Sequence, residues 1–169
     1  MATATIPTEP IVCPFTILID GREKAPYTFT GLKADAAQKY RPLHVPTRWT
    51  HLRTGDYTIE GMESLVAVER KSLSDLYSTL GQHRNRFEQE HKRLAVMTSA
   101  CVVIEADWDT IINRPPERSK LLPKVVYRTA ISWWEDYDVP WLALPDRRFA
   151  EITTFRILEK FWKKNSHSL

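Results

Sequence analysis

The sequence predicts one α/β domain with a mixed central sheet flanked by helices. Short apolar runs rich in valine and isoleucine alternate along the chain with longer segments of helical periodicity. The chain has 169 residues, of which 43% are hydrophobic and 27% are charged, as in soluble globular proteins. A chain of this length can bury one sizeable core, and it carries no internal repeat and no interior linker.

The first half of the chain supplies a buried strand and a hairpin. An apolar run that ends in a carboxylate predicts the strand, and proline and glycine mark the turns. The second hairpin strand is apolar on both faces, which is typical of a strand with layers on each side. The expected order is strand 15–20, turn 21–26, a short helix within 31–40, and hairpin strands 50–60 and 64–72 around a turn at 61–63.

The second half is expected to alternate helices with strands. Ser72 is a suitable N-cap for the first helix, and Pro123 stands near the start of another, where proline is tolerated. The expected order is a helix over 72–97 that Gly81 weakens or bends, strand 101–106, a loop with Pro115 and Pro116, helix 123–137, strand 139–144 and helix 146–164.

The ends of the chain and its two cysteines set the expected boundaries and compartment. Residues 1–12 are expected to be a flexible tail, 13–164 the folded domain and 165–169 a short C-terminal tail. No apolar run is long enough to cross a bilayer, and the N-terminus does not resemble a signal peptide. Cys13 and Cys101 lie in apolar runs and are interpreted as buried thiols in a reducing compartment, so a cytoplasmic protein is expected.

Basic residues are unevenly distributed along the chain. The net charge is +3 and the isoelectric point about 8.9, which alone says little about partners. Residues 114–128 contain five basic residues against one acid, and 147–164 contain six against two. Such faces suit a polyanion, but a solvated helix surface explains them equally well.

The segment that carries chemistry lies in the expected hairpin. Glu69 and Lys71 are two residues apart in a strand, so their side chains project from one face and Arg70 projects from the other. If the turn centres near residue 62, Asp56 lies across from the end of the second strand, beside Glu69. Adjacent carboxylates repel each other, and a divalent cation relieves that repulsion. Carboxylate oxygens favour Mg²⁺ or Mn²⁺ over Zn²⁺.

These groups suit the hydrolysis of a phosphodiester bond. A metal can polarise a phosphoryl oxygen and lower the pKa of a bound water. Lys71 can orient that water or stabilise the charge that grows on the phosphate. Asp20 and Glu23, at the end of the first strand, can extend the outer shell of the metal or position a second cation. Arg22 can hold a phosphate or pair with one of the acids.

Structural explanations exist for the same residues. A Glu-Arg-Lys run is common on solvated surfaces, whereas here it closes an apolar strand at a junction with a helix, where unused charges are costly. Asp56 after a glycine fits turn chemistry, and Asp75 favours a helix N-terminus. All of these residues in order are unlikely to occur together by chance.

Three motifs combine these residues: ID-x-RE at 19–23, L-x-x-GDY at 52–57 and VERKS-x-x-DL at 68–76. Together they resemble the nuclease domain of the XPF family of structure-specific endonucleases. The signature of that family, GD, a variable gap, ERK, three residues and D, is present without departure. The resemblance covers roughly residues 15–105.

The resemblance implies a restriction-endonuclease-like fold, dependence on Mg²⁺ or Mn²⁺, and cleavage of DNA near branches, flaps or single-strand junctions. It implies that Asp56 and Glu69 are metal ligands and that Lys71 is the catalytic lysine. Arg70 is expected to brace the site from the opposite face through an ion pair, with Asp75 as partner. The active-site members of less defined role are Asp20, Arg22, Glu23, Arg70 and Asp75.

The chain also departs from the family's usual organisation. Many members carry a C-terminal pair of helix-hairpin-helix motifs that grip DNA, and some a helicase portion, for which this sequence has no room. Branch specificity is therefore in question. The grip on DNA is expected from this domain, from a partner, or from a homodimer through the last two helices. A free-standing domain of this kind suits a phage or bacterial protein.

Further side chains are candidates for contacts with DNA or a second copy. Arg84 and Arg86 can reach a phosphate, although Arg86 and Glu90 can equally form an i,i+4 pair on a solvated face. Trp108 is expected at the surface. The tryptophans expected in the core or a dimer interface are Trp133, Trp134, Trp141 and Trp162.

Three functions remain open at this point. The first is a metal-dependent DNA endonuclease, which the complete set of acids and lysine favours. The second is a catalytically silent DNA-binding or scaffolding subunit. The third is an enzyme that hydrolyses phosphate esters of RNA or nucleotides, although no glycine-rich phosphate loop indicates a nucleotide cofactor.

Overall fold

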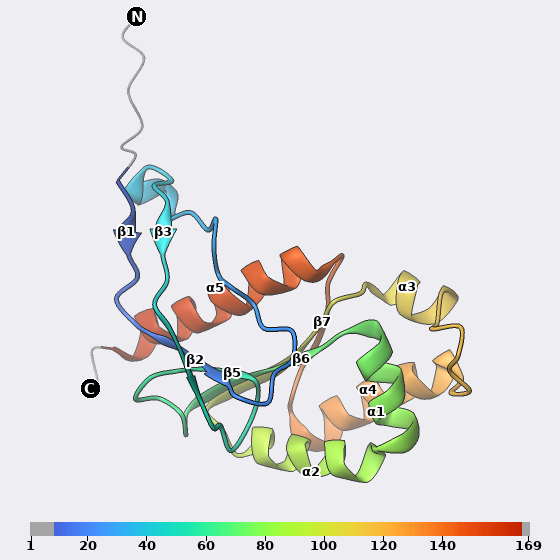
Figure 1. The fold of residues 1–169 in the computed structure, drawn as a ribbon. Coiled ribbons are helices and arrows are strands. Elements are labelled where there is room, and N and C mark those ends of the chain that lie inside the picture. Colours follow the sequence, from blue (N-terminus) through green and yellow to red (C-terminus); the bar gives the residue numbers. More distant parts are fainter. Residues whose placement is uncertain (1–8, 167–169) are drawn as a thin grey trace, which may run out of the picture.

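The computed structural model describes residues 9–166 and contains eight strands, five α-helices and one short 3₁₀ helix within that range (Figure 1). The strands are β1 (Ile11–Val12), β2 (Ile17–Asp20), β3 (Leu43–His44), β4 (Thr47–Thr50), β5 (Tyr57–Ile59), β6 (Val66–Lys71), β7 (Ser99–Ile104) and β8 (Trp141–Ala143). The helices are η1 (Ala36–Gln38), α1 (Leu73–Gln82), α2 (Arg84–Ala95), α3 (Trp108–Asn113), α4 (Pro123–Tyr137) and α5 (Arg147–Asn165).

Six strands form a mixed sheet in the order β4-β2-β5-β6-β7-β8. The hairpin strand β5 runs antiparallel to both of its neighbours, β2 and β6, and the remaining neighbours are parallel. The expected mixed sheet and the expected hairpin are therefore confirmed. β6 is buried along its length except at its last residue, as the apolar pattern on both of its faces predicts.

Each face of the sheet carries its own apolar core. On one face α5 packs against β5, β6 and β7 (Figure 1). Phe155 and Leu158 of α5 are fully buried there. On the other face α1, α2 and α4 cover β6 and β7 around Leu76, Phe87 and Trp133. The domain is thus a three-layer sandwich, and the predicted site residues emerge where its central strands end.

Local sequence signals account for the ends of several helices. The side chains of Ser72, Asp107 and Asp146 each accept a hydrogen bond from a backbone N–H in the first turn of α1, α3 and α5. Pro123 occupies the first turn of α4, and the predicted bounds of this helix are correct. The long helix predicted over 72–97 divides into α1 and α2 at His83, whereas Gly81, where a bend was expected, is helical.

Several short elements were not predicted. β4 and α3 were missed because a four-residue strand and a six-residue helix give little periodicity. Ile11 and Val12, assigned to the tail, pair as β1 with β3, a contact between segments 32 residues apart that leaves no local signal. Asn165, assigned to the C-terminal tail, is the last residue of α5, while residues 1–8 and 167–169 of the predicted tails lie outside the described residues.

Cys13 and Cys101 are both buried and free, as expected. Burial raises the pKa of both thiols, that of Cys101 to about 12. Trp134, expected in the core or a dimer interface, is not in the core, since its exposed fraction is 55%. Trp108, expected to be exposed, is partly buried against the core. No helix formed by residues 9–166 is long and apolar enough to span a membrane.

Candidate active site

A cavity of about 630 Å³ lies where β2 and β6 end and α1 and α2 begin. The predicted site residues that line it are Asp20, Arg22, Glu23, Asp56, Glu69, Arg70, Lys71, Asp75 and Arg86. Arg84 does not line it. The fold therefore brings residues from three distant stretches of the sequence to a single concave surface.

The two acids and the lysine meet at one end of the β5–β6 hairpin. Tyr57 pairs with Val68, so the residue before Tyr57 lies across from the residue after Val68. Asp56 accepts a hydrogen bond from the backbone N–H of Arg70 at 2.8 Å. Nζ of Lys71 donates to Oε1 of Glu69 at 2.6 Å, as two side chains on one face of a strand can.

Burial and mutual repulsion disturb the ionisation of these groups. Burial raises the pKa of Asp56, and the charge of Glu69 raises it further. Burial also raises the pKa of Glu69. The positive charge of Lys71 lowers this pKa, whereas the negative charges of Glu90 and Glu23 raise it further. Burial alone would lower the pKa of Lys71, but the charges of Glu69 and Asp56 outweigh it and the pKa is raised. The cavity therefore holds crowded carboxylates around one ammonium group.

Glu90, from α2, is an acid of this cavity that the sequence did not reveal. Its Oε1 accepts a hydrogen bond from the backbone N–H of Gly55 at 2.8 Å, and its Oε2 pairs with Arg93. The i,i+4 pair of Glu90 with Arg86 does not form in the structure, because Glu90 is held by these other partners. A glutamate within a charged helix reads as solvated surface, so only the tertiary contact identifies it.

Asp20 and Arg22 fasten the turn after β2 to the wall of the cavity. Oδ2 of Asp20 accepts from Nε of Arg22 at 2.8 Å, and its Oδ1 accepts from the backbone N–H of Leu52 at 3.3 Å. Nη2 of Arg22 donates to the carbonyl oxygen of Leu52 at 2.9 Å. The Asp20 carboxylate is almost fully buried, whereas the Arg22 side chain is 58% exposed and accessible from the cavity.

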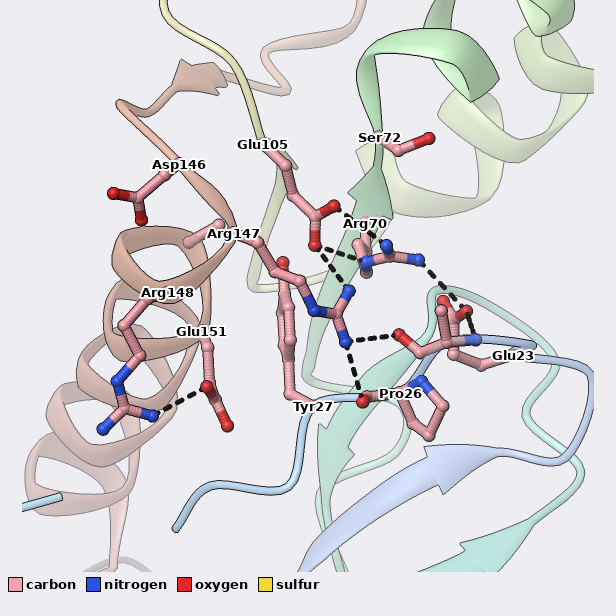
Figure 2. A network of polar contacts seen from close by, with 12 residues as sticks. Glu23, Pro26, Tyr27, Arg70, Ser72, Glu105, Asp146, Arg147, Arg148 and Glu151 are labelled. Atoms are coloured by element: carbon pink, nitrogen blue, oxygen red, sulfur yellow. Dashed lines mark hydrogen bonds and ion pairs between the residues drawn. The ribbon is translucent and has the colours of Figure 1, made fainter. Parts of the chain in front are cut away.

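Arg70 points to the other side of β6 and joins a network of buried charges (Figure 2). Its guanidinium donates two hydrogen bonds to Glu105, at 2.7 and 2.9 Å, and one to Glu23 at 3.1 Å. The predicted pair between Arg70 and Asp75 is wrong. Asp75 instead accepts a hydrogen bond from the hydroxyl of Ser72 at the start of α1, a partner three residues away that is always within reach.

The same network ties α5 to the segment that carries Glu23 (Figure 2). Arg147 pairs with Glu105 at 2.9 Å and donates to the carbonyl oxygens of Ala25 and Pro26 at 2.8 and 2.9 Å. Its guanidinium lies 5.0 Å from the ring centroid of Tyr27. Arg147 thus holds the Glu23 segment by its backbone and, through Glu105, supports Arg70.

The first turns of α5 also hold the backbone beyond Tyr27. Oε1 of Glu151 accepts from the backbone N–H groups of Thr28 and Phe29 at 3.1 and 2.6 Å, while Oε2 pairs with Arg148. Phe29 has a φ of 55°, which a side chain disfavours, and these hydrogen bonds fix it there. The two arginines at the start of α5 are therefore engaged with carboxylates and carbonyl oxygens of this chain, so they do not form the free cationic face for a polyanion that the sequence suggested.

The two arginines proposed from the sequence to reach DNA differ in position. Nη1 of Arg84 donates to the hydroxyl of Thr129 at 2.8 Å, and its guanidinium lies 5.0 Å from the ring centroid of Trp133. Arg84 therefore packs α2 against α4 and is turned away from the cavity. Arg86 lines the cavity and forms no ion pair with any residue between 9 and 166.

The donor set of the cavity fits a hard divalent cation. No three His, Cys, Asp or Glu side chains among residues 9–166 cluster closely enough to hold a metal by themselves. Mg²⁺ does not require such a cage, since one or two carboxylates together with water and substrate phosphate oxygens usually bind it. Asp56 and Glu69 provide those two carboxylates, and the charge of a cation would relieve their repulsion.

Comparison with known proteins agrees with this geometry. The model of the ERCC4 domain family matches residues 19–153, which contain every residue that lines the cavity. No curated protein matches the chain significantly.

Solved structures show the same fold. XPF from Aeropyrum pernix is 17% identical and superposes with a TM-score of 0.57 over 89% of this chain and 61% of that one. The same protein in complex with DNA is 18% identical, with a TM-score of 0.59 over 89% of this chain and 66% of that one. The chain thus spans less than two thirds of these structures, and the likeness confirms the expected nuclease fold.

Proposed function

We propose that this chain, which belongs to the ERCC4 domain family, is a divalent-metal-dependent endonuclease that hydrolyses DNA phosphodiester bonds. The family is one of nuclease domains. The observation that carries the proposal is the convergence of Asp56, Glu69 and Lys71 on one cavity that is open to solvent. Two carboxylates that can hold a metal ion, with an ammonium group beside them, suit phosphodiester hydrolysis by water.

Asp56 and Glu69 would hold the Mg²⁺ or Mn²⁺ ion. A divalent ion bound there polarises a phosphoryl oxygen and lowers the pKa of a coordinated water. The backbone N–H of Arg70 fixes the Asp56 carboxylate, and Glu90 fixes the backbone of the preceding glycine, so β6 and α2 both hold the site in place. This support keeps the ligands oriented before a substrate arrives.

Lys71 serves as an electrostatic group and not as a base. Its pKa is raised by Glu69 and Asp56, so the amine stays protonated near neutral pH. Nζ lies 4.6 Å from the ring centroid of Phe87, which positions the ammonium group over an apolar wall. From there it stabilises the negative charge that develops on the phosphate during attack by water.

We further propose DNA with a branch, flap or single-strand junction as the substrate. The support is the fold shared with an XPF structure solved in complex with DNA. The cavity itself is open to solvent, and its walls also present Arg22 and Arg86, both accessible to a phosphate. A duplex end and a single strand can both approach such an opening.

A cleavage panel of flap, fork, duplex and single-stranded DNAs with Mg²⁺ or Mn²⁺ tests the proposal. The wild type should cut at least one of the branched substrates. Asp56→Asn should lose cutting by roughly three orders of magnitude or more while retaining DNA binding, since removal of a negative charge does not weaken attraction to phosphate. Asp109→Asn, which removes an exposed carboxylate on α3, is the matched control and should cut like the wild type.

Two outcomes would favour the other functions. If the wild type binds branched DNA but leaves every substrate intact at enzyme excess, the chain is a silent DNA-binding subunit. If matched RNA is cut faster than DNA, the site acts on RNA. Calorimetric titration with Mn²⁺ adds a readout independent of cutting, because heat that is absent in Asp56→Asn locates the ion at this cavity.

We also propose that two copies associate through α4 and α5. Both helices expose apolar side chains within the described part of the chain. On α4 these are Tyr127, Ile131 and Trp134, at helical spacing. On α5, a largely apolar cavity is lined by Phe149, Ile152 and Phe161 among other residues. Exposed apolar patches of this kind are typical of interfaces between protein chains.

A further inference from the structure

A second cavity, of about 610 Å³, adjoins the catalytic cavity. It lies between one side of α1 and the segment 116–121 that precedes α4. Ser74 lines both cavities, so the two meet at the start of α1. The first turn of this helix is therefore the ridge over which anything that extends from one cavity enters the other.

The lining of the second cavity is cationic. Arg118 and Lys120 line it, and no aspartate or glutamate of the described residues does. Within residues 9–166 neither cation forms an ion pair or a side-chain hydrogen bond, in contrast to the nearby Arg114, which pairs with Asp109. The hydroxyls of Ser74, Ser78 and Ser119 add hydrogen-bond donors to the same surface.

The two cavities therefore differ in the ligand that they suit. The catalytic cavity contains crowded carboxylates and requires a cation before it can accept a phosphate. The second cavity offers two uncommitted cations and several hydroxyls, which bind a phosphate directly. Asp75 is the acid at the shared ridge, and its carboxylate accepts a hydrogen bond from Ser72 and lines only the catalytic cavity.

We infer that the second cavity binds backbone phosphates of the same DNA strand whose scissile phosphate lies in the catalytic cavity. This inference rests on the proposed function. The strand leaves the catalytic cavity over Ser74 and continues between α1 and the segment 116–121, where Arg118 and Lys120 neutralise successive phosphates. Contacts of this kind fix the direction and register of the strand and carry no base specificity.

Binding of single-stranded oligonucleotides with Ca²⁺ in place of Mg²⁺ tests the inference, because Ca²⁺ is also held by carboxylate oxygens, and a gel verifies that the strands stay intact. The double variant Arg118→Gln, Lys120→Gln should bind a long strand about tenfold more weakly than the wild type. The slope of log Kd against log salt concentration should fall by about 1.4, since each phosphate contact on a single strand contributes about 0.7. Fluorescence anisotropy over a range of salt concentrations measures both quantities.

The matched control is Lys33→Gln, Lys39→Gln. It removes the same two positive charges from exposed positions that line neither cavity. Because the net charge changes equally, any loss of DNA affinity that both double variants share reports only the overall electrostatic attraction between the protein and DNA. Equal losses in the two double variants, or no loss in either, would overturn the inference.

A series of strand lengths distinguishes direct phosphate contacts in the second cavity from a long-range electrostatic attraction to the whole protein. Oligonucleotides too short to leave the catalytic cavity should bind the wild type and Arg118→Gln, Lys120→Gln equally, and the deficit should appear only beyond a threshold length. A deficit of the same size at every length would contradict the inference.

The two proposals can fail separately. If the length-dependent deficit is present but DNA is never cut when Mg²⁺ or Mn²⁺ replaces Ca²⁺, the proposed nuclease activity fails and the proposed phosphate contacts of the second cavity stand. If the wild type cuts DNA but the Arg118→Gln, Lys120→Gln variant binds strands of every length like the wild type, the proposed phosphate contacts fail and the proposed nuclease activity stands.

Discussion

At Gly55 the chain passes so close to β6 that a side chain has no room. A Cβ atom there would lie 2.9 Å from Cβ of Ala67 and 3.2 Å from the carbonyl oxygen of Val68, and the φ of 72° already disfavours any other residue. The close approach places the Gly55 N–H within reach of Glu90 and positions Asp56 one residue later. A single glycine therefore connects backbone packing with the proposed metal site.

Gly55→Ala should destabilise the domain by about 2–4 kcal/mol, from left-handed strain together with overpacking. Gly61→Ala is the matched control, because Gly61 also has a positive φ, 82°, but a Cβ atom added there would meet no other atom within 4 Å. It should lose only the strain, about 1 kcal/mol. Urea unfolding measures both, and equal losses would show that the close contact at Gly55 costs nothing.

His91 is a second residue whose role appears only in the fold. It is fully buried among Phe87, Trp133 and Trp141. Nε2 accepts a hydrogen bond from Nε1 of Trp141 at 2.8 Å, so Nδ1 carries the proton and donates to the carbonyl oxygen of Phe87 at 3.1 Å. Burial lowers the pKa of His91 from 6.5 to about 4, and the imidazole is neutral in the folded protein.

This shift predicts the direction of a pH dependence. Between pH 6.5 and 4 the unfolded state binds a proton at His91 that the folded state does not, so this residue lowers stability as the pH falls. The free energy of unfolding should drop by up to about 1.4 kcal/mol per pH unit in that window relative to His91→Gln, which can keep both hydrogen bonds. Parallel pH profiles of the two proteins would contradict the assignment.

Among the secondary-structure elements, α5 begins with two cations, which interact unfavourably with the helix dipole. Arg147 and Arg148 occupy its first turn, where the helix dipole disfavours cations. Each cation is stabilised there by a carboxylate. Arg147 pairs with Glu105, which follows β7, and Arg148 pairs with Glu151, one turn further along α5. The start of α5 therefore acts as a support for the Glu23 segment of the candidate active site.

Arg147→Gln should loosen that segment and slow cleavage by about tenfold, since small displacements of catalytic groups are costly to rate. Arg148→Gln is the matched control, because the two side chains are 44% and 46% exposed and lie in the same turn. Hydrogen exchange of the backbone amides of residues 23–25 should quicken only in Arg147→Gln. Equal effects on exchange and rate in both variants would indicate a general loss of helix stability.

The sequence determines some elements better than others. Both ends of α4 were predicted correctly because Pro123 marks its start and its apolar stripe runs without interruption. The start of α1 was predicted from its N-cap residue, Ser72. Residues 27–50 gave no clear pattern because their partners lie elsewhere in the chain. Thr28, for instance, is fixed by Glu151, 123 residues away, and such a partner leaves no mark on local periodicity.

At the scale of the whole molecule, the proposed dimer makes a direct prediction. Phe149→Glu, which places a charge on the apolar surface of α5, should convert a dimer to a monomer without unfolding the chain. Trp49→Glu is the control, since Trp49 on the edge strand β4 is 53% exposed, close to the 51% of Phe149. Sedimentation velocity distinguishes the states, and a wild type that is monomeric at all concentrations would refute the dimer.

The candidate catalytic set was visible in the sequence, and its support was not. Asp56, Glu69 and Lys71 lie within 16 residues of one another in a hairpin, so strand geometry alone brings them together. Glu90, Glu105 and Arg147 complete the site from α2, from the residue after β7 and from α5. Their contacts depend on how three layers pack, which a single sequence does not encode in any local pattern.

The position of Arg147, far downstream of the residues that it supports, has a consequence for synthesis. A ribosome makes Asp56, Glu69 and Lys71 long before it makes the residue that anchors Ala25 and Pro26. Until α5 has emerged and docked, the nascent chain has its ligands but lacks the clamp on the Glu23 segment. A translation product that stops before α5 would therefore carry the proposed metal ligands without the contacts that hold the Glu23 segment in place.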